Sequence, residues 1–129
     1  MARPRSVGPT PKELAILQVL WDKGPSTVRQ IHQAISRKSG TGYTTTLKLL
    51  QVMFDKELVV RDESEQSHVY RPRISQERTQ RQMVRDLLDR AFRGSARQLV
   101  MHALSAKQAS AKELAEIRKL LNELEGDQS

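Results

Sequence analysis

The sequence predicts a mainly α-helical protein with one small β-hairpin, and three observations lead to this fold class. Apolar residues recur at three- and four-residue spacing through most of the 129 residues, as on one face of a helix. Over residues 58–72 the spacing falls to about two, which is typical of half-buried strands. Capping boxes, in which Thr or Ser is followed three residues later by Glu, mark helix starts at Thr10 and Ser110. We therefore expect three short helices, a hairpin and three further helices.

Net charge indicates the class of partner. The chain carries a formal charge of +7 and has a pI near 10.1, which favours a polyanionic partner. Residues 1–73 hold 12 Lys and Arg against 7 Asp and Glu, whereas residues 74–129 hold 10 against 8. The N-terminal part is therefore the better candidate for binding nucleic acid. Aromatic residues are few, which argues against a stacking platform for single strands.

Cysteine usage and hydropathy indicate the compartment. The chain has no cysteine, which excludes a disulfide framework and a thiolate metal site and fits a reducing cytoplasm. No apolar run approaches the ~18 residues of a membrane span, and no signal peptide opens the chain. We expect a cytoplasmic protein with no membrane partner and no cofactor.

Residues 1–9 contain two prolines, one glycine and two arginines, Arg3 and Arg5, without periodicity. We interpret them as a flexible basic arm. The arm either reaches DNA phosphates or the minor groove, or is only a frayed terminus.

The first two helices are set off by caps and breakers. Thr10 is the expected N-cap of the first helix, and Gly24-Pro25 ends it. Either Ser26 or Thr27 caps the second. The apolar faces of the two helices are Leu14, Leu17, Leu20 and Trp21, and then Val28, Ile31, Ala34 and Ile35.

The stretch 41–57 predicts the third helix, and the rest of the chain is organised around it. Its apolar face is expected to hold Leu47, Leu50 and Phe54, with Leu49 and Met53 beside them. The threonine run before this face suits a helix start, because hydroxyls can satisfy open backbone N–H groups. A polar, short-chained helix start, uncharged except for Lys48, has the chemistry of a reading head for the major groove. The alternative is an ordinary capped amphipathic helix.

A hairpin follows the third helix. Residues 58–61 and 67–72 are the expected strands, joined by an acidic turn. Three helices followed by a hairpin predict a winged helix-turn-helix domain over residues 10–73, with the third helix in the groove and the hairpin along the backbone. The expected partner is double-stranded DNA. The candidate contacts are Arg3, Arg5, Arg29, Tyr43, Thr44, Thr45, Lys48, Arg61 and Arg71.

Residues 74–129 predict a three-helix dimerisation domain. Three helices of this length bury little apolar area alone, and a second copy would supply the missing area. The alternative is that they fold back on the N-terminal domain. The expected dimer interface consists of Phe92, Leu99, Leu114, Ile117, Leu121 and Leu124.

Enzymatic activity is not expected. The chain has no glycine-rich phosphate loop, no cysteine nucleophile and no metal-binding spacing, and His32, His68 and His102 fall in different elements. The remaining alternative to a DNA-binding protein is a winged-helix module that binds protein without operator specificity.

The order of these motifs resembles the penicillinase-repressor (BlaI/MecI-type) family of winged-helix transcriptional regulators, from about Gly8 to Leu124. The resemblance rests on five segments: P-T-P-K-E-L-A-I-L-Q-V-L-W, G-Y-T-T-T-L-K-L-L, V-Y-R-P, L-L-D-R-A-F-R-G-S and A-K-E-L-A-E-I-R-K-L-L. It implies a homodimeric repressor that binds a palindromic operator. In the best-known members a sensor detects a β-lactam, and proteolysis within the C-terminal part releases the DNA.

Two positions depart from the family pattern. The Asn-Phe bond that is cleaved in those members is replaced here by His102-Ala103. The cysteine-containing metal motif of copper-responsive relatives is absent, which excludes a thiolate copper switch. The operator, the target genes, the inducing signal and the involvement of a regulatory protease stay open.

Overall fold

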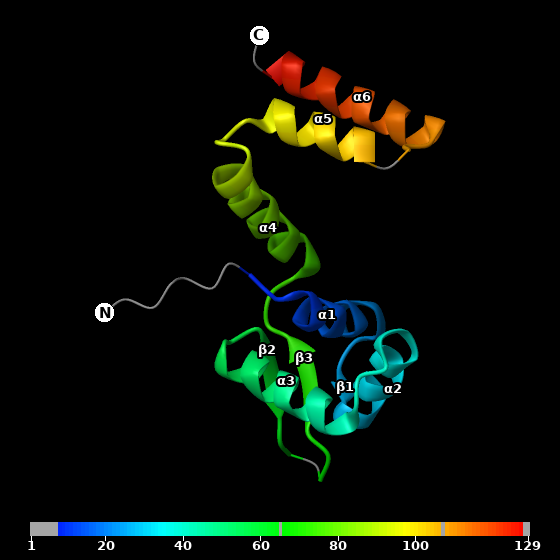
Figure 1. The fold of residues 1–129 in the computed structure, drawn as a ribbon, viewed down its shortest axis with the longest axis vertical. Helices are drawn as coiled ribbons and strands as arrows, with labels where there is room; N and C mark the ends of the chain where they lie inside the picture. Colours follow the sequence, from blue (N-terminus) through cyan, green and yellow to red (C-terminus); the bar gives the residue numbers. More distant parts are fainter. Residues whose placement is uncertain (1–7, 65, 107, 128–129) are drawn as a thin grey trace, which may run out of the picture. The chain divides into compact units, whose positions relative to one another are not determined.

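The computed structural model describes residues 8–64, 66–106 and 108–127, and it confirms the mainly α-helical class with a small antiparallel sheet (Figure 1). The first elements are α1 (Pro11–Lys23), β1 (Ser26–Thr27), α2 (Val28–Ser39), α3 (Tyr43–Asp55), β2 (Val59–Asp62) and β3 (Val69–Pro72). The last are α4 (Gln76–Ala91), α5 (Ala96–Ala106) and α6 (Ala111–Asp127). The chain divides into two compact units, residues 1–86 and 87–129, and the division falls within α4.

The predicted caps of α1 and α6 are confirmed. The Thr10 hydroxyl accepts from the Glu13 N–H at 3.2 Å, and the Glu13 carboxylate accepts from the Thr10 N–H at 2.9 Å. Ser110 and Glu113 form the same reciprocal pair. For α2 the sequence left two candidate caps, and the cap is Thr27, whose hydroxyl accepts from the Gln30 N–H.

The sheet contains one strand more than the sequence predicted. β1 has only two residues and pairs antiparallel with β3, which also pairs with β2, giving the order β1-β3-β2. Two residues are too few to show periodicity, so this strand left no sequence signal. The predicted hairpin strands are also slightly misplaced, since β2 begins at Val59 and β3 at Val69.

The core of the N-terminal unit gathers side chains from α1, α2, α3 and the sheet. Its buried apolar members are Ile16, Leu17, Leu20, Ile31, Ile35, Leu50, Met53, Val59 and Tyr70. Trp21 packs against this cluster, and its indole N–H donates to the Ile74 carbonyl at 3.1 Å. The bond ties the end of α1 to the segment that follows β3.

Two expectations for α3 are wrong. Its N-cap is Gly42, and no side chain caps the helix, because Tyr43 and the threonines after it already lie inside the helix. The buried face consists of Thr46, Leu50 and Met53, whereas Leu47 is 42% exposed. Thr46, Leu50 and Met53 follow one another at four- and three-residue spacing and share the face that packs into the core, whereas Leu47 lies one position further round the helix.

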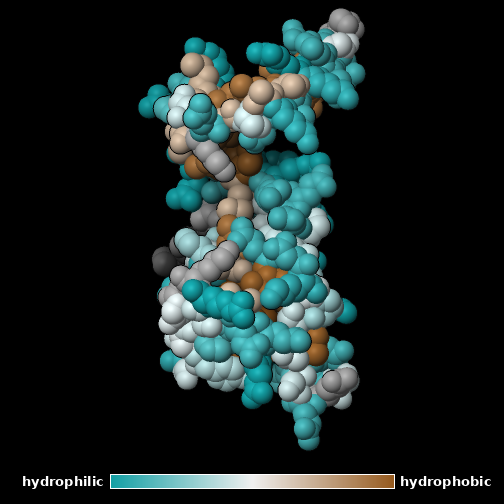
Figure 2. Space-filling model, turned by 90° about the vertical axis from the view of Figure 1, so that its right-hand side faces the viewer, coloured by the Kyte–Doolittle hydropathy of each residue, from teal (hydrophilic) through white to brown (hydrophobic). Residues whose placement is uncertain are grey.

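The C-terminal helices leave their apolar side chains exposed. None of the described residues of α5 and α6 is buried. Figure 2 shows the result as brown surface among teal in the upper part of the view. The large exposed apolar residues of this unit are Leu87, Val100, Met101, Leu104, Leu114, Leu120, Leu121 and Leu124.

Candidate nucleic-acid interface

The exposed face of α3 begins directly at its N-terminus. Tyr43, Thr44, Thr45 and Lys48 are all exposed, in agreement with their prediction as surface residues. Thr44, Lys48 and Gln51 follow one another at four- and three-residue spacing and therefore lie on one face. Because no side chain caps the helix, the N–H groups of its first turn face solvent and favour an anion there.

The first turn of α3 is held in place by α2. The Thr46 hydroxyl is fully buried and donates to the Gly42 carbonyl at 3.2 Å. It also lies 3.3 Å from His32 Nδ1, within hydrogen-bonding distance. The same imidazole packs edge-on against the Tyr43 ring, with 5.4 Å between centroids. His32 thus orients Tyr43, a role that sequence reasoning could not see because α2 and α3 meet only in the fold.

A groove of about 450 Å³ joins α3 to the wing. It brings together Arg29 and Tyr43, two predicted contacts that lie 14 positions apart in the chain. It also adds residues that the sequence analysis missed. These are Thr27, Leu47, Gln66, Ser67 and His68. Tyr43 and Leu47 in its lining place the groove beside the start of α3.

The two wing arginines face opposite sides of the hairpin. In the register of β2 and β3, Arg61 lies opposite Tyr70, whereas Arg71 lies opposite Val60. Since successive side chains alternate, Arg61 lies on the inner face with buried Val59. Arg71 lies on the outer face with its partner Val60. Arg71 is exposed, but the Arg61 side chain is only 16% exposed.

Arg61 is occupied by contacts within the chain. Its Nε donates to the Glu63 carboxylate at 2.9 Å, and its guanidinium lies 4.0 Å from the centroid of the Phe54 ring. Its Nη1 lies 3.4 Å from Gln51 Oε1 on α3. A hydrogen bond with Tyr70, followed by the bond to Glu63, raises the pKa of Arg61, so the guanidinium stays charged.

The acidic turn of the wing is held by its own backbone. The Asp62 carboxylate accepts from the Ser64 N–H at 2.9 Å. This bond, together with a bond from the Ser64 hydroxyl and the charge of Arg71, lowers the pKa of Asp62. The hydrogen bonds from Ser64 to Asp62 therefore favour the anionic form of its carboxylate.

Three further arginines were predicted to contact DNA. Arg29 is exposed at the start of α2, while Arg3 and Arg5 lie outside the described residues. Among the predicted dimer residues, Leu114, Leu121 and Leu124 are exposed, and Phe92, Leu99 and Ile117 are half-buried. These six come from the segment after α4 and from α5 and α6.

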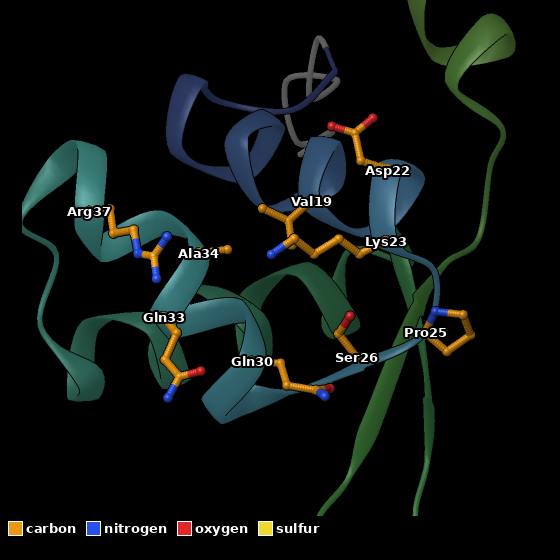
Figure 3. Close-up of a pocket in the computed structure, with 9 residues that line it drawn as sticks. All are labelled: Val19, Asp22, Lys23, Pro25, Ser26, Gln30, Gln33, Ala34 and Arg37. Carbon is orange, nitrogen blue, oxygen red and sulfur yellow. The ribbon is translucent and has the colours of Figure 1, made fainter.

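A second groove lies on the far side of α2 from α3. It has a volume of about 510 Å³ and is lined by residues of α1 and α2 (Figure 3). Lys23 and Arg37 extend into it, with Gln30 and Gln33 at its edge. It contains none of the predicted DNA contacts.

The described ranges show neither a metal cluster nor a membrane span. No group of three or more His, Asp or Glu side chains is placed to hold a metal ion in residues 8–64, 66–106 and 108–127. Within the same ranges, no helix is long and apolar enough to cross a membrane.

Comparison with known proteins decides the family. The sequence model of the penicillinase repressors matches residues 9–123. The chain belongs to the penicillinase repressor family. This confirms the resemblance that the five sequence segments carried.

Curated relatives agree with membership of the penicillinase repressor family. The chain is 31% identical over 114 residues to the transcriptional regulator BlaI of Mycobacterium tuberculosis, covering 88% of this chain and 82% of that protein. It is 21% identical over 112 residues to the penicillinase repressor of Staphylococcus aureus, covering 87% and 89%. The predicted class, a transcriptional regulator and not an enzyme, is thereby confirmed.

Solved structures support the fold of this penicillinase repressor family member. A transcriptional regulator from Thermotoga maritima superposes with a TM-score of 0.51 at 15% identity, covering 92% of this chain and 75% of that one. The complex structure of hsRosR-S4 also superposes with a TM-score of 0.51 at 16% identity, covering 94% of this chain and 93% of that one. At these identities the likeness concerns the fold alone.

Proposed function

We propose that this penicillinase repressor family member is a homodimeric repressor that reads a palindromic operator with α3. The observation that carries the proposal is the exposed, uncapped start of α3. Short polar side chains stand there on a helix whose opposite face is fixed in the core. In winged helix-turn-helix proteins this element enters the major groove, and the wing follows the backbone.

Two exposed arginines near α3 suit the phosphate backbone. Arg29 borders the groove beside Tyr43, and Arg71 stands on the outer face of the wing. We assign Thr44, Thr45 and Lys48 to the major groove and Tyr43, Arg29 and Arg71 to the backbone. Arg3 and Arg5 remain proposed phosphate contacts on sequence grounds. A chromosomal DNA partner would place the protein in the cytoplasm.

The proposed second subunit would cover the apolar side chains of the C-terminal helices. A monomer would leave Leu114, Leu121 and Leu124 in water, at a cost that burial against a second copy would remove. Two copies would present two α3 helices to two half-sites. Residues 74–129 are the proposed dimerisation domain.

Release from DNA is proposed to follow an inducing signal that is still to be identified. If antibiotic stress acts through a regulatory protease, the bond at the family's cleavage position is His102-Ala103. Both residues lie inside α5, so this helix would have to unwind before a protease could cleave it. Blotting of the intact protein in cells before and after β-lactam treatment tests this route.

Footprinting on the DNA upstream of its own gene tests the proposed function. We expect protection of two half-sites related by a dyad and about one helical turn, or a small multiple of it, apart. Protection of a single site without symmetry would refute the palindrome. If no sequence is protected there, and none is enriched from a random DNA pool, the protein-binding alternative is favoured.

A further inference from the structure

Gln51 lies on the face of α3 that carries the proposed DNA contacts. It follows Lys48 by three residues and Thr44 by seven, so all three project from the same side of the helix. It is exposed, and the sequence analysis gave it no role.

Two neighbours fix the orientation of the Gln51 amide. Its Nε2 donates to Asp55 Oδ1 at 3.1 Å, one helical turn further on. Its Oε1 is 3.4 Å from Arg61 Nη1 on the wing. A carboxylate only accepts and a guanidinium only donates, so the amide cannot be flipped without losing both bonds.

Arg61 can orient Gln51 because Arg61 is itself held on three sides. Glu63 binds its Nε at 2.9 Å, Phe54 lies under its guanidinium, and Tyr70 faces it across the sheet. Phe54 belongs to α3 and Glu63 to the wing, so the guanidinium connects the two elements. It is not free to reach for a phosphate without breaking these contacts.

The remaining hydrogen-bonding capacity of Gln51 matches one base. A primary amide has two donors and an oxygen with two lone pairs, and the bonds to Asp55 and Arg61 use one of each. One donor and one acceptor are left. In the major groove adenine offers the complement, an N7 acceptor beside an N6 donor, whereas guanine offers two acceptors.

We propose that Gln51 is a specificity-determining residue that recognises an adenine in the major groove, with Arg61 and Asp55 as positioning residues. The inference rests on the proposed function, because it requires α3 to enter the groove. It replaces the phosphate contact that the sequence predicted for Arg61 with a role within the protein.

Selection of binding sites from a random DNA pool tests the assignment. The full-length protein is compared with Gln51→Ala, Gln51→Glu and the control Gln18→Ala, which changes an exposed residue of α1. Wild type and control are expected to share one strongly preferred adenine per half-site, favoured roughly five- to 150-fold over another base. Gln51→Ala should lose this preference at that position alone. Gln51→Glu should move it towards cytosine, whose N4 donor suits an acceptor-only side chain.

The role of Arg61 is tested with Arg61→Gln and Arg61→Lys, after thermal melting has shown that both fold. If Arg61 positions Gln51, both variants should weaken the adenine preference and leave the salt dependence of affinity unchanged. Arg61→Lys should behave like Arg61→Gln even though Lys keeps the charge. If Arg61 instead contacts a phosphate, the opposite pattern is expected. Arg61→Gln would then flatten the log–log salt slope by about 0.9 with the adenine preference intact, and Arg61→Lys would restore the slope.

The outcomes separate this inference from the proposed function. A wild-type protein that enriches no sequence would overturn both. A wild type with a defined operator and a Gln51→Ala variant with the same base preferences would overturn the inference alone. A flattened slope in Arg61→Gln with the preference kept would overturn the positioning role of Arg61.

Discussion

At the scale of single residues, Thr44 and Thr45 differ from Thr46 in what their side chains face. The first two are exposed and the third is buried. Replacing Thr44 or Thr45 with Ala should cost about 1–3 kcal/mol on operator DNA and little on random DNA, because base contacts are lost. Fluorescence anisotropy with both DNAs measures the difference. An equal loss on the two DNAs would mean that these threonines do not read bases.

The Glu13 carboxylate takes part both in a helix cap and in a contact between distant parts of the chain. It completes the cap of α1 and also accepts from Lys56 Nζ at 3.0 and 3.1 Å, while it is 2% exposed itself. Glu13→Gln should lower the free energy of unfolding by about 1–3 kcal/mol, since the Lys56 ammonium loses its partner.

The matched control for Glu13 is an exposed ion pair of the same chain. Glu77 and Arg81 pair at 2.8 Å with side chains more than 70% exposed. Glu77→Gln should change the free energy of unfolding by less than about 0.5 kcal/mol. Urea denaturation measures both variants, and equal effects would show that burial of the Glu13 pair contributes nothing.

The sequence predicted the interactions between residues close in the chain and missed those between residues far apart in it. The cap of Glu13 spans three residues and could be predicted, whereas its Lys56 partner lies 43 positions away. The contact between His32 and Thr46 likewise depends on how α2 meets α3. Residue types and spacing contain no information on such pairs until the helices are packed.

At the scale of elements, the wing shows what periodicity can and cannot predict. The hairpin was predicted, but its strands were started one and two residues too early, and the pairing register that assigns the two wing arginines to separate faces was not predicted. With the register known, Arg71 is the exposed cation and Arg61 the internal one. Alternation along a strand distinguishes the two arginines only when the register is right.

The outer face of the wing gives a prediction on salt dependence. Arg71→Gln should weaken binding to all sequences similarly and flatten the log–log salt slope by about 0.9, because one phosphate is no longer neutralised. Arg29→Gln should do the same at the groove between α2, α3 and the wing. Arg97→Gln, which removes an equal charge from α5, serves as control. An unchanged slope in Arg71→Gln would show that the wing does not touch the backbone.

The turn of the wing should respond to acid. Because its folded pKa is lowered from 3.8, Asp62 contributes stability that is present above the unfolded value and lost as the pH falls through the folded one. The Ser64 amide proton, followed by NMR below about pH 4, should report the loss of its acceptor. In Asp62→Asn, which keeps an oxygen acceptor but does not titrate, this transition should disappear. A transition that persists in the Asn variant would belong to another group.

At the scale of the whole molecule, periodicity predicted the helices but not what covers them. The stripes of α5 and α6 were predicted correctly as helical faces, yet none of their described residues is buried within one chain. A stripe on a helix specifies that something apolar packs there. It does not distinguish a second copy from the same chain, and only a measurement of assembly does.

That measurement also decides whether a palindrome can be read. One α3 helix covers only a few base pairs, so discrimination across a genome needs two half-sites held at a fixed spacing. Replacing Ile117 and Leu121 with Asp should abolish the dimer, because two charges would be buried without partners in the proposed interface. The fold of residues 10–73 should survive, since the core of that domain contains neither residue.

The control for the dimer is Lys119→Asp on the opposite face of α6, which changes the net charge by the same two units. Light scattering at micromolar concentration should find a dimer for the wild type and for Lys119→Asp, and a monomer for the double variant. Operator binding by the double variant should fall steeply at nanomolar protein, because each α3 then binds one half-site alone. A wild-type monomer would remove the palindrome from the proposal, and a double variant that still dimerises would place the interface on another surface of the C-terminal helices.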